Sequence, residues 1–432
     1  MRIDILAIGS RGDVQPYVAL GLGLRGAGHC VRIVTLGGFE DFVQSRGLDH
    51  LAIGDTPQEI AKTSAGRDWI RRRTTVLGFL RGFVRVADSL IEEGIARYWQ
   101  SCRGVEALIT SPMGLLVGDH IGERLRIPLL LAQPAPPGLW TCYDWDGSKN
   151  LGTIVRGGLK GLIHATFHFA IWSQVRRSTN AARNRILQLP SLNLIAPFRA
   201  SKRKTPILGA YSPLVAPKLP DWGDWIHVTG YWFLDDLQGW NPPCSLADFL
   251  ESGPPPIFIG FGSTPFPRPE AATALIVQAV SRAGCRAVVV AGGSGLATGQ
   301  LSSQVLSVDF VPHSWLFSRV CAAVHHGGAG VTGAALRAGV PSVVVPVFAD
   351  QPFWASRVFE LGAGPRPIPA RHLTADNLAN AIRATASREI QRRAAALGEQ
   401  IRSENGIVRA VEIIDQYLGR GAALTAACQP MH

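Results

Sequence analysis

Short apolar runs alternate with longer mixed stretches in the first half of the chain, and each run is typical of a buried strand. The runs cover residues 3–8, 31–35, 107–110 and 128–132, and helix-like stretches such as 16–27 lie between them. Strands that alternate with helices form a parallel sheet covered by helices on both faces. The first half is therefore predicted to be a doubly wound α/β domain.

The same alternation starts again in the second half of the chain. Strands are predicted at 257–260, 287–290, 306–308, 322–324 and 342–345, followed by helices at 374–386 and from 388 to about 417. Two proline-rich stretches, Asn241-Pro242-Pro243 and Gly253-Pro254-Pro255-Pro256, are typical of a linker. The expected organisation is an N-terminal domain (1–238), a linker (239–256), a C-terminal domain (257–402), and a final helix and tail (403–432) that can return to the first domain.

Composition sets the broad class of the protein. The chain has 432 residues, of which 47% are hydrophobic and 17% charged, so two domains can each bury a core. It has no uninterrupted run of eighteen or more apolar residues, so no transmembrane helix is predicted, and its N-terminus enters a strand without a signal-peptide pattern. The seven cysteines are scattered without a C-x-x-C pair, which favours a reducing, cytoplasmic compartment over disulfides or a zinc site.

The net charge of +11 is unevenly distributed. Residues 147–220 contain no Asp or Glu but many Lys and Arg, and the stretch 159–175 within them is apolar and aromatic. This pattern fits a basic amphipathic element in peripheral contact with an anionic inner membrane face. It equally fits a core helix with solvated arginines. No nucleic-acid-binding motif accompanies the charge, so no nucleic-acid partner is expected.

A glycine-rich loop follows the strand at 322–324 and precedes a helix expected at 331–338. It contains His326, Gly328, Ala329 and Gly330, and the helix opens with Val331 and Thr332. Glycines let the backbone approach a ligand closely, and the first N–H groups of a helix favour phosphate. The alternative is an ordinary strand–turn–helix crossing. A second polar cluster about twenty residues on, Asp350-Gln351-Pro352, favours the anion site.

These stretches, together with 310–317, resemble the nucleotide-sugar signature of family 1 glycosyltransferases, in particular sterol glucosyltransferases and the bacterial enzymes that decorate glycopeptides and other natural products. The stretch 9–16, Gly-Ser-Arg-Gly-Asp-Val-Gln-Pro, is similar to the opening of the same enzymes. The resemblance implies a GT-B fold, in which two doubly wound Rossmann-like domains face an interdomain cleft. It also implies inverting, metal-independent transfer of a hexose, with UDP-glucose favoured, to a hydroxyl of a sterol, lipid or polyketide-like acceptor. No cofactor is expected beyond the nucleotide sugar.

Asp13 is the candidate catalytic base. It follows the first strand in a loop opened by two glycines, where a carboxylate could reach an acceptor hydroxyl. From the residues alone, capping of the following helix is the better interpretation, because Asp is favoured at helix N-termini. The resemblance favours catalysis, since Asp13 matches the base of the family. This chain has no His near that position, so the His–Asp pair of many plant relatives is not expected.

The resemblance also names the donor-binding residues. Ser10, Arg11 and Gly12 would meet the donor from the N-terminal domain, and the loop of His326 and the following helix would hold the diphosphate. Gly262, Ser263 and Thr264 offer further donors after the strand at 257–260. Relatives usually carry Thr or Ser where this chain has Val331. Either Thr332 compensates, or diphosphate binding depends more on backbone N–H groups.

Asp350 and Gln351 match the acid–amide pair that binds sugar hydroxyls in the family, although a simple turn before Pro352 is the alternative. The nucleobase is expected near Val311 and His313, where backbone groups can bind a pyrimidine edge, whereas Trp315 is expected in the core. Apolar residues of the N-terminal domain suit either a hydrophobic acceptor or an ordinary core. They are Trp69, Phe79, Phe83, Trp140, Tyr143, Phe167, Phe169 and Trp172.

Two motifs are not expected to carry function. Residues 21–26 match G-x-G-x-x-G but fall inside a predicted helix rather than in the turn after a strand, so NAD binding is not expected. The Asp144-Trp145-Asp146 triplet mimics a metal-binding D-x-D but stands in a loop without a supporting acid. Three other functions remain open: transfer of a dTDP-deoxysugar, nucleotide-sugar epimerisation, and a non-catalytic auxiliary role.

Overall fold

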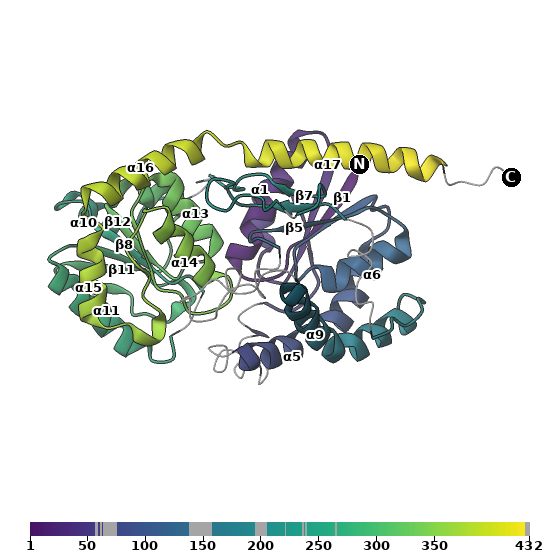
Figure 1. The fold of residues 1–432 in the computed structure, drawn as a ribbon, viewed down its shortest axis with the longest axis horizontal. Helices are drawn as coiled ribbons and strands as arrows, with labels where there is room; N and C mark the ends of the chain where they lie inside the picture. The colour runs from purple at the N-terminus through teal and green to yellow at the C-terminus, as the bar shows by residue number, and fades with distance from the viewer. Residues whose placement is uncertain are drawn as a thin grey trace.

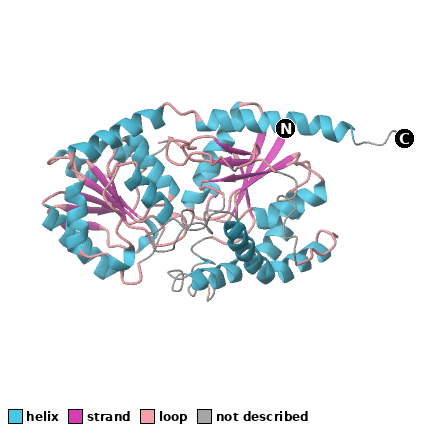
Figure 2. Cartoon of the chain, viewed as in Figure 1, coloured by secondary structure: helices cyan, strands magenta, loops and turns pink. Residues whose placement is uncertain are grey.

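The strands of the two halves form two separate sheets in the computed structural model, one in each lobe (Figure 1). Helices pack on both faces of each sheet (Figure 2). The structure describes residues 1–56, 59–60, 63, 76–137, 158–194, 205–220, 222–235, 237, 240–263 and 266–427.

The N-terminal sheet is entirely parallel and has the order β3-β2-β1-β4-β5-β6-β7. Its strands are β1 Arg2–Leu6, β2 Cys30–Thr35, β3 Asp49–Ala52, β4 Ala107–Thr110, β5 Leu129–Gln133, β6 Ile207–Gly209 and β7 Ile226–Val228. Its helices include α1 Arg11–Gly26, α2 Glu40–Gln44, α5 Val76–Ser101, α6 Leu115–Leu125 and α9 Gly158–Arg185.

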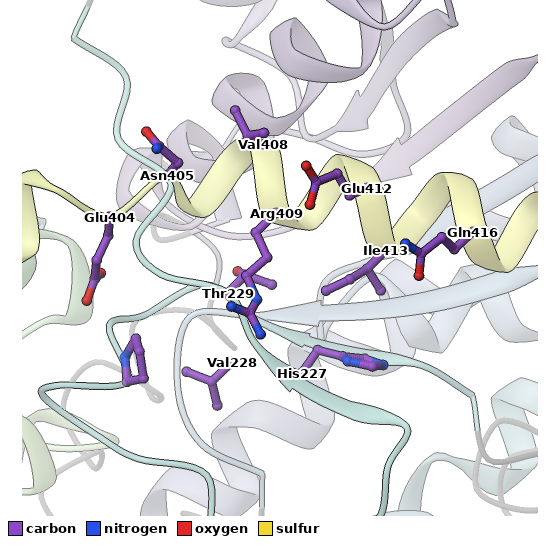
Figure 3. A pocket seen from close by; sticks show the side chains of 11 residues that line it. His227, Val228, Thr229, Glu404, Asn405, Val408, Arg409, Glu412, Ile413 and Gln416 are labelled. Atoms are coloured by element: carbon purple, nitrogen blue, oxygen red, sulfur yellow. The ribbon is translucent and has the colours of Figure 1, made fainter.

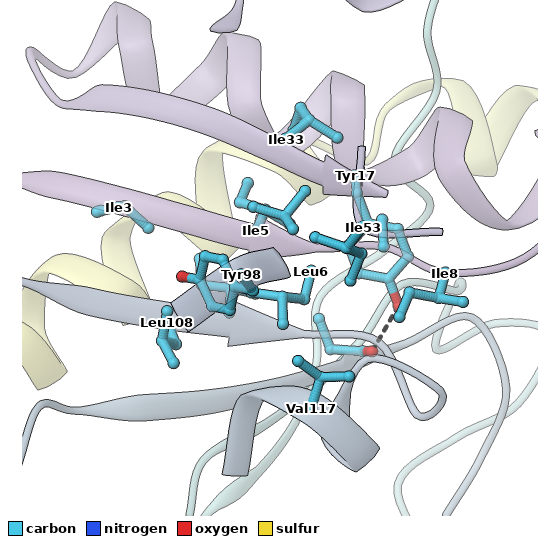
Figure 4. Close-up of a cluster of buried hydrophobic side chains, with 14 of the residues drawn as sticks. Ile3, Ile5, Leu6, Ile8, Tyr17, Ile33, Ile53, Tyr98, Leu108 and Val117 are labelled. Atoms are coloured by element: carbon cyan, nitrogen blue, oxygen red, sulfur yellow. Dashed lines mark hydrogen bonds between the residues drawn. The ribbon is translucent and has the colours of Figure 1, made fainter. Parts of the chain in front are cut away.

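The central strand β1 is buried because its alternate side chains face helices on both sides of the sheet. Ile3 and Ile5 are fully buried, and Tyr17 of α1 packs beside them (Figure 4). The Tyr17 hydroxyl donates a hydrogen bond of 2.6 Å to the carbonyl of Ala132 on β5 (Figure 4). This bond ties to the sheet the same helix, α1, that carries Asp13 in its first turn.

The C-terminal sheet has the order β10-β11-β9-β8-β12-β13, with β10 antiparallel to its neighbour and the other pairs parallel. Its strands are β8 Ile257–Gly260, β9 Ala287–Val290, β10 Gly299–Ser302, β11 Val305–Val308, β12 Ala322–His325 and β13 Ser342–Val344. Its helices are α10 Cys244–Glu251, α11 Pro269–Ala283, α12 His313–Leu316, α13 Ala329–Ala338, α14 Gln351–Glu360, α15 Ala375–Ala384 and α16 Arg388–Arg402.

The last helical region differs from its prediction. One helix was expected from 388 to about 417, but the chain breaks at 403–405 between α16 and α17 Gly406–Ala427. Helix α16 lies on the C-terminal lobe, and α17 crosses to the N-terminal lobe (Figure 1). There α17 packs against α1, where a Cβ on Gly23 would come within 2.4 Å of Ile407. His29 Nε2 also lies 2.8 Å from an Asp415 carboxylate oxygen.

This packing explains the G-x-G-x-x-G match in α1. Gly23 leaves room for α17, and a Cβ on Gly21 would crowd Leu48 and Ile33. Gly21 and Gly23 therefore serve helix packing inside α1.

The predicted linker contains a helix that belongs to the C-terminal core. Leu246 and Phe249 of α10 pack with Phe258 of β8 and Phe317. The basic segment contains α9, which packs against α5. On α9 Trp172 is 1% exposed and donates its indole N–H to the carbonyl of Asn193 (3.0 Å), so this side chain is part of the core. No described helix is both long and apolar enough to cross a membrane.

Candidate functional site

Ser10 is the N-cap residue of α1, and Asp13 lies in the first turn of this helix, where the sequence predicted a loop. One carboxylate oxygen of Asp13, Oδ2, accepts hydrogen bonds from the Ser10 backbone N–H (2.7 Å) and the Ser10 hydroxyl (2.8 Å). Gly9 has a φ of +148°, and a Cβ there would lie 2.5 Å from this oxygen. Asp13 keeps contact with solvent, but the surrounding protein desolvates its carboxylate and raises its pKa, while the bonds from Ser10 lower it. The turn thus presents a carboxylate with a fixed orientation.

Arg11 extends from this turn to the C-terminal half. Its guanidinium lies 4.7 Å from the ring centre of Phe42 on α2 and 4.3 Å from that of Phe310 before α12. His313 stacks on Phe317 with ring centres 5.0 Å apart, and burial together with Arg11 lowers the pKa of His313 to about 4. A neutral His313 therefore faces the N-terminal turn at the predicted base site.

Three glycine-containing loops meet around His326. A Cβ on Gly328 would lie 2.6 Å from His326 Nε2, and a Cβ on Gly262 would lie 3.1 Å from its Cε1. Ser263 follows Gly262 and packs against Gly293, whose Cβ would lie 3.1 Å from the Ser263 Cα. The residues that follow β8 and β12 and are predicted to bind the diphosphate are thus close neighbours. This agrees with the pairing of these parallel strands, whose carboxyl ends are adjacent. Thr264 lies outside the described residues.

Helix α13 begins earlier than predicted. It starts at Ala329 instead of Val331, and Thr332 N–H makes a helical bond to Gly328 O (3.0 Å). The N–H groups of Ala329, Gly330 and Val331 therefore precede this bond and are the first-turn donors that a helix offers to an anion. Thr332 is fully buried, and its hydroxyl has no hydrogen-bond partner among the described residues.

Val331 is also buried, with 7% exposure, in the core beside Phe258. Neither of the two side chains that open the predicted helix thus extends into solvent. Of the two alternatives for the diphosphate, this geometry favours the backbone N–H groups over a compensating Thr332 hydroxyl.

His325 holds the turn of the same loop from within the core. It is fully buried, and its Nδ1 accepts a hydrogen bond from Gly327 N–H (3.1 Å). Burial and the neighbouring histidines lower the pKa of His325 to about 3, so the ring is neutral. Gly327 has a φ of +86°, and a Cβ there would lie 3.0 Å from the carbonyl of Gln351. The loop of His326 therefore rests directly on the Asp350–Gln351 turn.

That second turn is held by its own side chains. Gln351 Oε1 accepts hydrogen bonds from the N–H groups of Val347 (2.8 Å) and Phe348 (3.1 Å). Ala349 has a φ of +62°, a conformation that non-glycine residues adopt rarely and that often occurs at functional sites. The Asp350 Oδ2 atom accepts a hydrogen bond from the indole N–H of Trp354 (2.8 Å).

The two predicted acids lie close enough to interact across the halves of the chain. Burial raises the pKa of Asp350 to about 6, and the negative charge of Asp13 contributes to this rise. Asp13 and the described residues predicted to bind the donor are therefore parts of one region formed by both halves. Among the acceptor candidates, Trp172 is buried in the core and Phe169 is 47% exposed. Trp69, Trp140, Tyr143 and the Asp144–Asp146 triplet lie outside the described residues, as do the side chains of Phe79, Phe83 and Phe167.

Two parts of this region were not predicted from the sequence. Gly292 and Gly293 follow strand β9 and touch the loop of Gly262 and Ser263; glycines directly after a predicted strand were an available signal. Trp354 lies two residues after the Asp350-Gln351-Pro352 stretch and was not predicted to be part of the site. A separate groove of about 590 Å³ between β7 and α17, with His227 and Arg409 in its walls (Figure 3), includes none of the predicted site residues.

Two family models match the chain. A glycosyltransferase family 28 N-terminal domain matches residues 3–141, and an erythromycin biosynthesis protein CIII-like C-terminal domain matches residues 275–409. The first covers the turn of Asp13, and the second covers the loops of His326 and Asp350.

Curated relatives match nearly the whole chain. A sterol 3-beta-glucosyltransferase of Cryptococcus neoformans var. neoformans serotype D is 35% identical over 96% of this chain and 27% of its own length. One from Kluyveromyces lactis is 35% identical over 100% of this chain and 36% of its own. The chain thus spans about a third of the length of these relatives.

Solved structures share the fold. The glycosyltransferase of kitacinnamycin has a TM-score of 0.65 at 18% identity, covering 96% of this chain and 99% of that one. The Streptomyces sp. SF2575 glycosyltransferase SsfS6, complexed with thymidine diphosphate, has a TM-score of 0.62 at 19% identity, covering 96% and 99%. The predicted architecture of two Rossmann-like domains is thereby confirmed.

Proposed function

The chain has the two-lobed fold of the GT-B glycosyltransferases, and we propose that it transfers glucose from UDP-glucose to a hydroxyl of a sterol or another hydrophobic acceptor, with inversion at the anomeric carbon. UDP-glucose and a hydrophobic acceptor are favoured by the similarity to sterol 3-beta-glucosyltransferases. The proposed donor site consists of the loops of Gly262, His326 and Asp350, together with the turn of Ser10, Arg11 and Gly12 and the proposed nucleobase site at Val311 and His313.

This proposal depends above all on the position of the Asp13 carboxylate. Ser10 fixes one of its oxygens, and its charge acts on Asp350 in the opposite half of the chain. A base that deprotonates an acceptor must stand opposite the donor sugar, within hydrogen-bond reach of the attacking hydroxyl. Asp13 is the described carboxylate that matches the family's base and faces the donor-loop residues.

In the proposed step, the acceptor hydroxyl gives its proton to Asp13 while its oxygen forms a bond to the anomeric carbon. The bond from that carbon to the diphosphate oxygen breaks on the opposite face, and the electron pair leaves with the nucleoside diphosphate. The N–H groups of Ala329, Gly330 and Val331, together with His326, would stabilise the departing charge. Fixed donors of this kind lower the barrier without rearranging during the reaction, so we propose that no metal ion is required.

The test is release of UDP from UDP-glucose with and without a panel of sterols, phenols and lipids, in the presence and absence of EDTA. The proposal predicts acceptor-dependent release that EDTA leaves unchanged. A requirement for a divalent cation would contradict the metal-free step. Mass spectrometry of the product identifies the acceptor, and the proton NMR coupling of its anomeric hydrogen gives the stereochemistry.

The alternatives give different outcomes in the same assay. Release of dTDP from dTDP-sugars, without release of UDP from UDP-glucose, would support the alternative of a dTDP-deoxysugar transferase. The thymidine diphosphate complex of SsfS6 favours this alternative. Acceptor-independent conversion of the sugar would indicate an epimerase. Nucleotide binding without release for any pair would indicate an auxiliary protein; Asp13, His326 and Gln351 are present and argue against it.

Contact of the basic segment with an anionic membrane stays a prediction. Phe169 is exposed on α9 and supports it, whereas Arg183 is buried and pairs with Glu123 (2.9 Å), so its charge is already neutralised within the fold. Flotation with phosphatidylserine vesicles at low and high salt tests this contact. Absence of binding at low salt would contradict the prediction.

A further inference from the structure

Trp354 joins the Asp350 turn to the packing between the two lobes. Its ring is fully buried in α14, and its indole N–H donates a hydrogen bond of 2.8 Å to Asp350 Oδ2. We propose that Trp354 is a positioning residue that orients Asp350 toward the donor sugar and makes this orientation depend on the contact between the lobes. The proposal rests on the proposed function, because the sugar contact of Asp350 is part of it.

Two hydrogen bonds act on the Asp350 carboxylate, one from its own backbone N–H and one from the side chain of Trp354. Asp350 is the N-cap residue of α14, but its side chain makes no capping hydrogen bond. Its Oδ2 instead accepts a hydrogen bond from the indole N–H of Trp354, one helical turn later in the chain. A carboxylate held through one oxygen can still accept hydrogen bonds from sugar hydroxyls through the other. Because the indole N–H belongs to a rigid, buried ring, this bond restricts the rotation of the carboxylate.

The other edge of the Trp354 ring contacts the N-terminal half. The Tyr211 ring, which follows β6, lies edge-on with centres 5.9 Å apart at an interplanar angle of 61°. One turn along α14, Arg357 Nε donates to the carbonyl of Val215 (2.6 Å). Buried residues of both halves complete this interface: Val215, Ala216, Val228 and Tyr231 on one side, and Leu336, Phe353, Ala355 and Val358 on the other.

A shift of one lobe relative to the other would therefore move the ring that holds Asp350. Buried interfaces of close-packed rings resist small displacements and transmit strain. The charge of Asp13, which belongs to the other lobe, also acts on Asp350. Burial and the charge of Asp13 raise the pKa of Asp350, and the bonds from Trp354 and from the Asp350 backbone N–H lower it. The indole therefore favours the ionised form of the carboxylate that it orients.

Trp354→Phe tests the first half of the proposal, since it keeps an aromatic ring and removes the N–H. The variant loses the hydrogen bond to the charged Asp350, and in the proposed complex only the sugar contacts Asp350. We therefore expect UDP-glucose affinity to fall about tenfold while UDP affinity stays within about twofold. Calorimetry with each ligand measures both. The matched control is Trp232→Phe, which removes another buried indole donor, 3.0 Å from Thr229 Oγ1.

A second readout does not depend on the donor. The side-chain carbon signal of Asp350 in aspartate-labelled protein, assigned with Asp350→Asn, should titrate at a higher pH in Trp354→Phe than in the wild type or in Trp232→Phe. Unchanged titration and unchanged affinity would overturn the proposal, as would equal weakening of UDP and UDP-glucose. If the wild type does not bind UDP-glucose, the donor assignment fails, while a shifted titration still supports the hold on Asp350.

Tyr211 tests the link to the lobe interface. Tyr211→Leu removes the ring that contacts Trp354, whereas Tyr211→Phe removes only a hydroxyl that has no partner among the described residues. We expect the Leu variant to weaken UDP-glucose binding severalfold with UDP binding retained, and the Phe variant to resemble the wild type. If the Leu variant also binds UDP-glucose like the wild type, the dependence on the lobe interface is overturned.

Discussion

Ser10 holds Asp13 by two hydrogen bonds to a single carboxylate oxygen, one from its backbone N–H and one from its hydroxyl. Asp13 is the third residue of α1, so the same contact closes a capping arrangement at the start of the helix. The structural and catalytic interpretations of Asp13 are therefore compatible. A carboxylate fixed through Oδ2 keeps Oδ1 for a proton.

Asp13→Asn should abolish most transfer without preventing donor binding. Loss of a general base typically lowers the rate by about 10²–10⁴-fold, and the donor loops lie on the other half of the chain. Steady-state rates and UDP calorimetry measure the two effects. Asp41→Asn, an exposed change in the first turn of α2, is the control. Turnover at the wild-type rate in Asp13→Asn would rule out this base.

Removal of the Ser10 hydroxyl should change the pH profile. The bond from this hydroxyl lowers the pKa of Asp13, so Ser10→Ala should raise it. The base works when ionised, and the acid limb of the profile of kcat/KM should therefore move to higher pH. Ser10→Thr keeps a hydroxyl and should restore the wild-type limb. An acid limb that stays in place in Ser10→Ala would show that the hydroxyl does not tune the base.

Donor binding should weaken below pH 6. The pKa of Asp350 is about 6, so its carboxylate is ionised above that pH and loses its charge below it. A charged carboxylate accepts stronger hydrogen bonds from sugar hydroxyls than a protonated one. The KM for UDP-glucose should rise as the pH falls through this value. In Asp350→Asn the KM should be higher at neutral pH and independent of pH; a persistent acid dependence would assign the titration to another group.

The strands were predictable because they are buried on both faces. The runs at 107–110, 257–260 and 287–290 match β4, β8 and β9 to the residue, as continuous apolar runs in parallel sheets should. The short strands β3 and β6 carry no such run and were missed. The break before α17 ends at Asn405, and Asn405-Gly406 is a turn signal that was overlooked within an otherwise helical pattern.

The site residues likewise divide into those that a local pattern predicts and those that it does not. Asp13, His326 and Asp350 follow strands or glycine loops, so local pattern and family resemblance located them. The contact of Trp354 with Tyr211 joins positions far apart in the sequence, and no local period indicates it. The burial of Thr332 also depends on how α13 packs, because a start at Ala329 turns this hydroxyl toward the core.

The hydrogen bond from Gly327 N–H to His325 Nδ1 leads to the last prediction. His325 is neutral and fully buried, so it can accept at Nδ1 only with its proton on Nε2. In His325→Asn the amide oxygen takes the place of Nδ1, whereas in His325→Gln the longer side chain places its amide near the former Nε2. The Gln variant should leave the Gly327 N–H without its partner.

A buried N–H without a partner costs about 1–3 kcal/mol, and here the cost falls on the loop that carries His326. We expect UDP affinity to drop about tenfold or more in His325→Gln and only a few-fold in His325→Asn. Calorimetry with UDP measures this difference, and thermal melting of both variants separates it from a general loss of stability. Equal UDP affinities in the two variants would show that the Nδ1 contact does not organise the diphosphate loop.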